Sequence, residues 1–392
     1  MKTKNLLMAT AIALSFVAPT QVFAEYGDDA YKERVALSKQ IKKMKNMRKQ
    51  LPSPPPAGLF GVYAFPEKGQ YVAGVNFQHH EFSGLLNGST SVSAATAATS
   101  APNQFNGKPY QPETIRVIPN SAKANVIMPF INYTVNDKIA LVALAPLVEK
   151  ESILETFLGG SGSTSLDTNV VKSKGLGDVK FGALYKAYNS EDNKHNVIID
   201  AVLSAPTGSI TEMDMALPPA LVVDGSVVGN ADKKKVNSRM GYGMQLGGGT
   251  WDAMVGAAYW GKNDKWGYGV QYLATIPLEN KNSEGWRFGD KHELTAWSSY
   301  SWEPTLVSSF RLRTEHQDEI YGIDPNIYGP ALGAQTANYG GKITEASVGV
   351  NYMYAPAKNI SIEYITPISQ DRNGYQADKD SAIAISWRNA FF

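Results

Sequence analysis

The strongest constraint on the fold of this chain is a two-residue alternation of apolar and polar side chains, which runs from about residue 69 to the C-terminus. Successive side chains of a β-strand point to opposite faces, so this period is typical of strands. The clearest case is the stretch KWGYGVQYLATIPL, in which every second residue from Trp266 to Leu278 is apolar. The chain is therefore predicted to be an all-β protein.

Connection lengths distinguish a barrel from a soluble sandwich. The alternating segments predict about twelve strands, near residues 71–82, 122–134, 138–149, 175–188, 196–206, 241–260, 265–278, 291–302, 306–316, 343–354, 359–369 and 380–392. Tight connections (VNDK, NSEDNK, GKNDK, EPT and PAKN) alternate with long polar ones such as 83–121, 207–240 and 317–342. Short turns at one end and long loops at the other are typical of outer-membrane barrels, whereas a sandwich has no reason to sort its loops by end.

Aromatic residues gather beside the short turns, as an interfacial girdle would. Trp260 and Trp266 flank GKNDK, and the other turns are preceded by Tyr133, Tyr188, Trp302 and Tyr354. The predicted fold is a transmembrane antiparallel β-barrel of about 12 strands over residues 59–392, preceded by an N-terminal basic helix.

The C-terminal sequence SAIAISWRNAFF fits this fold, because the last strand of a closed barrel pairs with the first and leaves no edge. Ile383, Ile385, Trp387 and Phe391 are predicted to face lipid, and Ala384, Ser386 and Arg388 to face inward. The ending also resembles the terminal aromatic signal that barrel-assembly machinery recognises, so that machinery is an expected partner through Phe391 and Phe392.

The N-terminal segments have a different character. Residues 1–24 have the basic start, apolar run and small-residue cleavage pattern of a signal peptide, which predicts export to the outer membrane of a Gram-negative bacterium. Residues 25–58 combine a basic amphipathic helix, with Leu37, Ile41 and Met44 on one stripe, and a proline-rich linker. This helix is either a solvated periplasmic helix or one that plugs or docks on a channel.

A barrel of a dozen strands has a narrow lumen. The charged residues predicted to line it are Asp178, Lys180, Lys186, Asp200, Asp252, Glu293, Arg311, Arg313, Glu315, Glu345, Glu363 and Arg388. They have two interpretations that can hold together. They form interior ion pairs that link strands, or they set the selectivity of a pore.

Little in the sequence predicts catalysis, a metal or a cofactor. His79 and His80 are adjacent on a strand and point to opposite faces, so they cannot bind a metal together. No serine matches the outward-facing His292 as a lipid-hydrolysing barrel would need. A formal charge of +1 gives no support to nucleic-acid binding. The run from Asp232 to Lys235 either binds phosphates of lipopolysaccharide or is a solvated run of charge.

Four longer stretches resemble the outer-membrane family named for the phenol meta-cleavage pathway, which is loosely akin to the long-chain fatty-acid transporter porins. They are GLGDVKFGALYKAY, MQLGGGTWDAMVGAAYWG, WRFGDKHELTAW and IEYITPISQDRNGYQADKDSAIAISW. The residues that carry the resemblance are Gly177-Asp178, Gly289-Asp290, the GGGTWD stretch, Glu363, Pro367, Gln370 and Gly374. The resemblance implies passive passage of a small, often apolar or aromatic, solute across the outer membrane.

The leading hypothesis is therefore an outer-membrane channel or transporter for a small-molecule solute, with outer-membrane lipid and lipopolysaccharide as its surroundings. The alternative is a structural or assembly barrel that binds a partner through its N-terminal helix or its external loops. No enzyme activity is expected.

Overall fold

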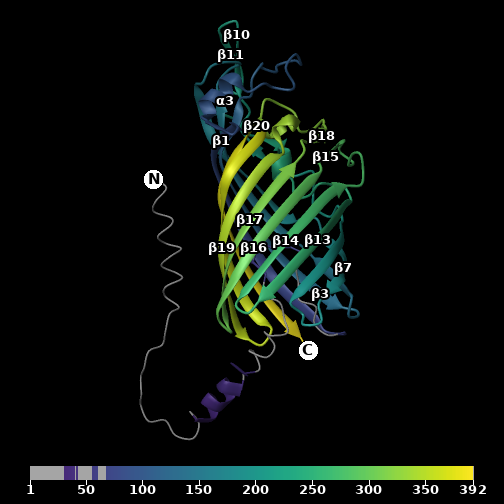
Figure 1. The fold of residues 1–392 in the computed structure, drawn as a ribbon. Coiled ribbons are helices and arrows are strands. Elements are labelled where there is room, and N and C mark those ends of the chain that lie inside the picture. The colour runs from purple at the N-terminus through teal and green to yellow at the C-terminus, as the bar shows by residue number, and fades with distance from the viewer. Residues whose placement is uncertain (1–30, 40, 43–54, 61–67, 392) are drawn as a thin grey trace.

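The computed structural model describes residues 31–39, 41–42, 55–60 and 68–391. Residues 31–39 and 41–42 are helical and lie beyond the end of the barrel at which the chain finishes (Figure 1). No helix within the described ranges is both long and apolar enough to cross a membrane. The predicted signal peptide, 1–24, and most of the predicted linker lie outside the described residues.

The described residues form a closed antiparallel barrel whose wall contains eleven strand elements. They are β1 (Tyr71–Gly88), β3 (Val117–Thr134), β4 (Ile139–Leu144), β7 (Lys180–Asn189), β8 (His195–Ser204), β13 (Asp252–Asn263), β14 (Trp266–Pro277), β16 (Lys291–Glu303), β17 (Leu306–Gln317), β19 (Gly341–Ala355) and β20 (Lys358–Phe391).

β20 accounts for two of the predicted strands. Its first half pairs with β19 as far as Arg372, and its second half pairs with β1 from there to Phe391. The chain turns back at Gly374, whose φ of +57° favours glycine. The eleven elements thus cross the wall twelve times, and an antiparallel ring needs an even number of crossings.

The ring closes where β1 pairs with the C-terminal half of β20, from Tyr71 opposite Phe391 to Gly88 opposite Arg372. The predicted faces of the last strand are confirmed, because Ile383, Trp387 and Phe391 are exposed outside and Ala384, Ser386 and Arg388 are buried inside. Asn389 breaks the outward apolar pattern, and its side-chain oxygen accepts a hydrogen bond from the hydroxyl of Tyr354.

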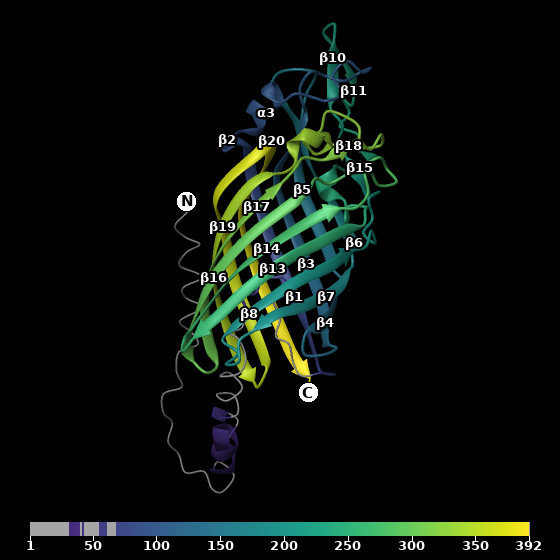
Figure 2. The same ribbon diagram turned by 45° about the vertical axis from the view of Figure 1, so that its right-hand side comes forward.

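The predicted sorting of the connections is also confirmed (Figures 1 and 2). The short turns 135–138, 190–194, 264–265, 304–305 and 356–357 lie at the end where the C-terminus is. The opposite end carries the long connections and their small elements: β2 (Thr90–Val92), α3 (Ala94–Ser100), β9 (Met213–Ala216), β10 (Ala220–Val223), β11 (Ser226–Gly229), β12 (Val236–Arg239), η1 (Tyr242–Met244), β15 (Trp286–Arg287), β18 (Tyr321–Gly322), η2 (Leu332–Ala334) and η3 (Thr336–Asn338).

The aromatic girdle is confirmed at five of the six predicted positions: Tyr133, Tyr188, Trp266, Trp302 and Tyr354 are exposed on the outside of the short-turn end. The prediction for Trp260 is wrong. It lies in the same register as Met254 and Ala258, so it faces the lumen and is only 6% exposed. Its nearness to a turn in the sequence gave the wrong face, because the face depends on the parity of its position along the strand.

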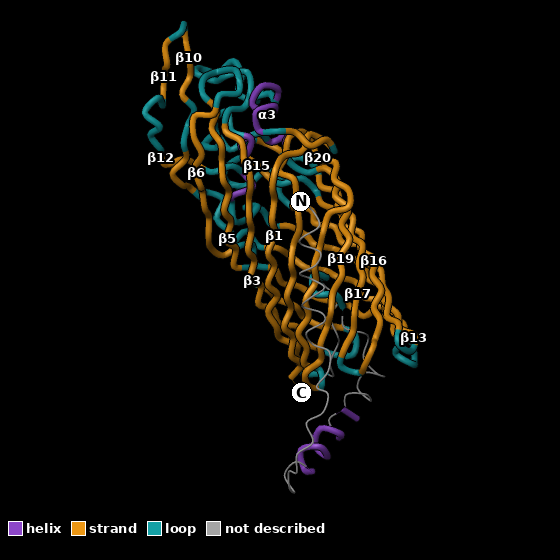
Figure 3. Tube along the Cα trace, turned by 90° about the vertical axis from the view of Figure 1, so that its left-hand side faces the viewer, coloured by secondary structure: helices purple, strands orange, loops and turns teal. Residues whose placement is uncertain are grey.

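The wall is not regular at the long-loop end. β4 continues into β5 (Leu147–Phe157) across Ala145 and Pro146, and β6 (Ser165–Leu176) continues into β7 across residues 177–179. Below these two breaks, β7 pairs with β8. Above them, β6 is the end of its sheet and pairs with β5 alone among the described strands. Figure 3 shows β5 and β6 extending, together with β10 to β12, above the rest of the wall.

The predicted strand 241–260 begins late. Residues 241–251 form η1 and an irregular glycine-rich segment, and the strand begins at Asp252. β8 ends at Ser204, opposite Asp252, so residues 241–251 have no neighbouring strand of the wall to pair with.

Candidate functional site: a plugged lumen and a break in the wall

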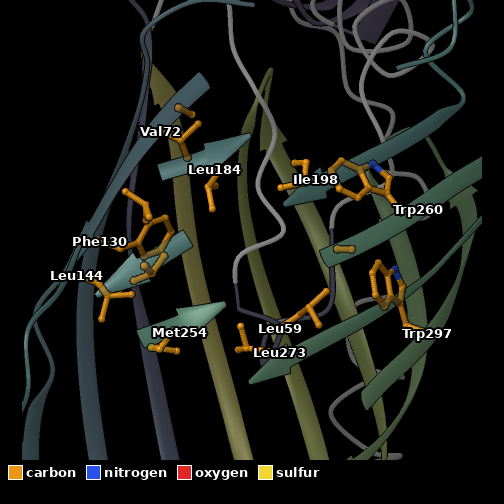
Figure 4. Packing of buried hydrophobic residues seen from close by; sticks show 14 of the residues in the cluster. Leu59, Val72, Phe130, Leu144, Leu184, Ile198, Met254, Trp260, Leu273 and Trp297 are labelled. Carbon is orange, nitrogen blue, oxygen red and sulfur yellow. The ribbon is translucent and has the colours of Figure 1, made fainter. Parts of the chain in front are cut away.

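The lumen has an apolar half. Strands β3, β4, β7, β8, β13, β14 and β16 turn large apolar side chains inward, and these form one buried cluster that includes Phe130, Val142, Leu184, Ile198 and Trp297. Figure 4 shows several of these side chains, among them Phe130, Leu184 and Trp297, projecting from the strands into the lumen. The residues predicted to line the lumen were all charged, but the strands of this half carry apolar residues on both faces, and apolar side chains line the lumen here.

The other half of the lumen carries paired charges on β16, β17, β19 and β20. Arg311 Nε lies 2.7 Å from Glu363 Oε1, and both residues are at most 3% exposed. Arg313 contacts Glu293, Glu315 and Glu345. Lys379, which the sequence analysis did not single out, also contacts Glu345. The prediction of interior ion pairs that link strands holds for these residues.

The remaining predicted lining residues are dispersed. Lys180 donates to the carbonyl of Asp178, at 3.1 Å, and Asp252 accepts from the hydroxyl of Thr250. Lys186 lies on β7 towards the short-turn end. Arg388 is buried and donates to Ser386 Oγ. Asp178 and Asp200 do not join the ion-pair network of the other half, and each has a separate setting.

Residues 55–60 (PPAGLF), which we call the plug, lie inside the lumen. Gly58 N–H donates to Glu363 Oε2, 2.6 Å away. Asn76 donates to the carbonyl of Ala57 and Gln271 to that of Phe60, both at 2.7 Å. Leu59 is 5% exposed and packs into the apolar cluster (Figure 4). The sequence analysis placed this stretch partly in a linker and considered the preceding helix as a plug, but the described part of that helix is outside.

The plug does not fill its level of the lumen completely. A cavity of about 30 Å³, enough for one or two water molecules, is lined by the plug and by residues of β1, β3 and β4. The cavity is bordered by apolar Met128, Phe130 and Leu144 and by polar Asn76 and Arg388. It therefore has an apolar side and a polar side.

Residues 240–248, which we call the gate segment, close the break in the wall between β6 and β13. Leu246 is buried against the inner face of the wall, and a Cβ placed on Gly175 would be 2.8 Å from its Cδ1. Lys150 donates to the carbonyls of Gly243 and Gln245, and Ser173 donates to that of Met244.

Asp178 fastens the gate segment to the kink between β6 and β7. Its Oδ1 accepts from Gly208 N–H at 2.9 Å and its Oδ2 from Gly248 N–H at 2.8 Å. A side chain at position 247 could not fit, because a Cβ there would be 2.3 Å from Asp178 Oδ1. Two of the sequence motifs, Gly177-Asp178 and the glycine run before Thr250, thus meet at one place.

The break is apolar on both of its sides. On the outside, Leu147, Leu176, Phe181 and Trp251 are all about 40–50% exposed, as lipid-facing side chains of an isolated barrel are. On the inside, the buried cluster of the apolar half extends to Leu144, the last residue of β4. Leu246 is the apolar residue of the gate segment between these two surfaces.

The long loops pack over the top of the barrel. Tyr242, Trp286, Ile327 and other apolar side chains of these loops form a second buried cluster. Arg239 ties three loops together, since its guanidinium lies 2.9 Å from Asp324 and 3.2 Å from Glu284. The loops therefore cover the end of the lumen opposite the short turns.

The other candidate groups have ordinary partners. His79 contacts Asn125 and Glu81 on the outer surface, and His80 contacts Gln78 on the inner surface, as predicted from their parity. The described residues contain no cluster of side chains suited to a metal ion. Lys233, in the external run of lysines, lies 3.4 Å from Asp167 of β6.

The comparisons with known proteins agree with this fold. The sequence matches no family model and no curated protein. The structure is similar to that of an outer membrane channel from Pseudomonas putida F1, with a TM-score of 0.52 and 14% identity, over 86% of this chain and 100% of that one. This likeness is one of fold: both chains are barrels of the outer-membrane type.

Two other similar structures are more distant. The toluene transporter TodX of P. putida is 13% identical, with a TM-score of 0.42 over 83% of this chain and 91% of its own. A FadL homologue of Pseudomonas aeruginosa is 10% identical, with a TM-score of 0.37 over 82% of this chain and 90% of its own.

Proposed function

We propose that this protein is an outer-membrane channel for the passive uptake of a small apolar or aromatic solute. The observation that carries the proposal is the break in the wall between β6 and β13, where β6 has no paired strand on that side and the gate segment packs against Ser173 and Asp178. A pore for ions or sugars has no use for such a break, whereas an apolar solute partitions into lipid and can cross the wall from there.

The proposed route has three steps. The solute collects among the lipid-facing side chains around Trp251 and Leu176, passes Leu246 when the gate segment moves, and reaches the apolar half of the lumen. It then passes the plug towards the short-turn end. The loops over the other end of the lumen favour this lateral route over one along the barrel axis.

The location is part of the proposal. A closed barrel with an apolar outer band and an aromatic girdle suits the outer membrane of a Gram-negative bacterium, which the fold similarity to an outer membrane channel also supports. We further propose that the C-terminal aromatic residues are recognised by the barrel-assembly machinery, and that Lys233 to Lys235 contact phosphates of lipopolysaccharide.

We propose that the chain is a relative of the family named for the phenol meta-cleavage pathway. The support is that its motif residues have specific structural uses. Asp178 and Gly247 fit against each other at the gate segment, and Glu363 holds the plug. Gly289 packs so tightly that a Cβ would be 2.4 Å from two backbone oxygens of 318–319.

The test uses the absence of cysteine from the chain. In the double variant Gly175→Cys/Leu246→Cys, an oxidised disulfide or a short reducible cross-linker would fasten the gate segment to β6. Uptake of a radiolabelled aromatic hydrocarbon by cells that carry the protein should fall when the pair is linked and recover on reduction. The single variants are the controls. Equal uptake in the linked and reduced states would refute the lateral route.

The alternative, a barrel that binds a partner through its N-terminal helix, has one observation in its favour: nearly all described side chains of that helix are exposed. Removing residues 25–54 separates the two functions. A channel should keep its uptake, while an assembly barrel should lose a stably bound periplasmic partner.

A further inference from the structure

One carboxylate of the lumen does not belong to the ion-pair network. Asp200 faces inward from β8, is 1% exposed, and makes no ion pair with any residue that the structure describes. Its neighbours are apolar: Ile198 and Val202 flank it on the same strand, and Leu184 lies opposite on β7. An ionised carboxylate in such surroundings is costly, and isolated ionisable groups within a membrane barrel commonly have a function.

Asp200 is only half satisfied by hydrogen bonds. Its Oδ2 accepts from Gln271 Nε2 at 3.2 Å, and its Oδ1 has no partner. The same amide of Gln271 donates to the carbonyl of Phe60 at 2.7 Å. The carboxylate therefore lies directly behind the plug, and displacement of the plug would leave both Asp200 and Gln271 open to the lumen.

Further unpartnered polar groups continue from Asp200 towards the short-turn end. Asn196 is on the same face of β8, four residues or about 13 Å nearer to that end. Trp260 lies directly opposite Asn196 on β13. The amide nitrogen of Asn196 and the indole nitrogen of Trp260 are both buried without a partner. Both groups are hydrogen-bond donors, whereas the free oxygen of Asp200 is an acceptor.

We infer that Asp200 is a recognition site for the protonated amine of an apolar solute. This inference rests on the proposed function and narrows the substrate class of the channel. An ammonium group would supply the missing donor and the missing positive charge, and the alkyl part of the solute would lie against Leu184, Ile198 and Leu273.

The test compares three water-soluble probes of equal chain length: octylamine, 1-octanol and octanoate. Binding to the full-length protein in nanodiscs is measured by tryptophan fluorescence, since Trp260 and Trp297 line the lumen. We expect octylamine to bind at least tenfold more tightly than the other two. Asp200→Asn should reduce the affinity for octylamine to that for octanol and leave octanol unchanged.

Two further variants complete the experiment. Asp252→Asn changes another inward carboxylate, which already accepts from Thr250, and should keep the preference for the amine. Asp200→Glu keeps the charge and should retain most of the preference, which tests the site even if Asp200→Asn folds poorly.

The possible outcomes separate the inference from the proposed function. Equal binding of octylamine and octanol, or an unchanged preference in folded Asp200→Asn, would overturn the amine site and leave the channel intact. A loss of octanol binding in Asp200→Asn would also overturn it, because the site would then recognise a hydroxyl group. Failure of the wild-type protein to bind any of the three would refute the channel for apolar solutes itself.

Discussion

Leu59 of the plug offers the cleanest perturbation of the lumen, because Leu59→Ala weakens the plug without altering the wall. The Leu59 side chain is 5% exposed and packs against the buried cluster of the apolar half. The hydrogen bonds that join the plug to the side chains of Glu363, Asn76 and Gln271 involve only backbone atoms of the plug, so the substitution leaves them in place.

The size of the effect follows from the buried surface. Truncating a buried leucine to alanine costs at least about 2 kcal/mol. Because about 1.4 kcal/mol corresponds to a factor of ten, the equilibrium between the plugged and displaced states should shift roughly 30-fold towards displacement. A plug that is displaced for about 0.1% of the time would then be displaced for about 3% of it.

Single-channel recording in a planar bilayer measures this shift directly. Leu59→Ala should open about 30 times as often or as long as the wild type, at an unchanged conductance of the open state. The matched control is Leu141→Ala, the same chemical change on the outer surface of β4, where the leucine is 48% exposed. It should leave the open fraction unchanged.

A wild-type open fraction in Leu59→Ala would refute the assignment of residues 55–60 as a plug, provided that the unheated variant keeps the electrophoretic mobility of a folded barrel. An open fraction that rises equally in Leu141→Ala would refute the reasoning as well, since it would trace the effect to the wall.

Three other perturbations have defined outcomes. Glu363→Gln leaves either Gly58 N–H or the buried Arg311 without its acceptor, a loss of about 3–5 kcal/mol of stability. The melting temperature of this variant should therefore fall and its open fraction should rise. The control Glu149→Gln, which changes an exposed surface ion pair with Lys174, should alter neither quantity. Asp178 accepts one charge-assisted hydrogen bond from Gly208 and one from Gly248 of the gate segment. Asp178→Asn removes one of the two and weakens the other, each worth about 1.5–3 kcal/mol, so uptake of an apolar solute should rise, while Asp167→Asn should leave uptake unchanged. In the external loops, burial raises the pKa of Tyr339, whose hydroxyl donates to Gly333 O and accepts from Gly243 N–H. The contribution of the protonated Tyr339 to the free energy of unfolding is complete below the ordinary tyrosine pKa of about 10. It is lost as the pH rises through the higher pKa of the folded state. An alkaline titration of phenolate absorbance should show a late component that Tyr339→Phe removes, and an identical late component in the variant would contradict this assignment.

The sequence predicted the wall of the barrel well, because the pattern there is local. Parity along the last strand gave the outward face of Trp387 and the inward face of Arg388 correctly. Turn length and polarity gave the short-turn end. These features depend on neighbours one or two residues away, which periodicity records directly.

The contents of the lumen were not predictable in the same way. The plug was taken for a linker and the start of the barrel, because nothing near Gly58 in the sequence points to Glu363, 305 positions away. The gate segment was predicted as the start of a strand, because its sequence does not show that β8 ends at Ser204. That end leaves residues 240–248 without a neighbouring strand of the wall to pair with. The apolar lining of one half of the lumen was not predicted, because β4 carries apolar residues on both faces and its sequence does not show which face is the lumen.

The contact between Gly58 and Glu363 also constrains how the molecule is made. Ten residues separate the plug from Tyr71, the first residue of β1, which forms the closing seam with the last strand. The plug contacts β1, β14 and β20 through Asn76, Gln271 and Glu363, so its binding site exists only once these strands have assembled into the wall. Because the chain enters β1 at the short-turn end, away from the covering loops, residues 55–60 take their place as the ring closes and then stabilise the closed ring.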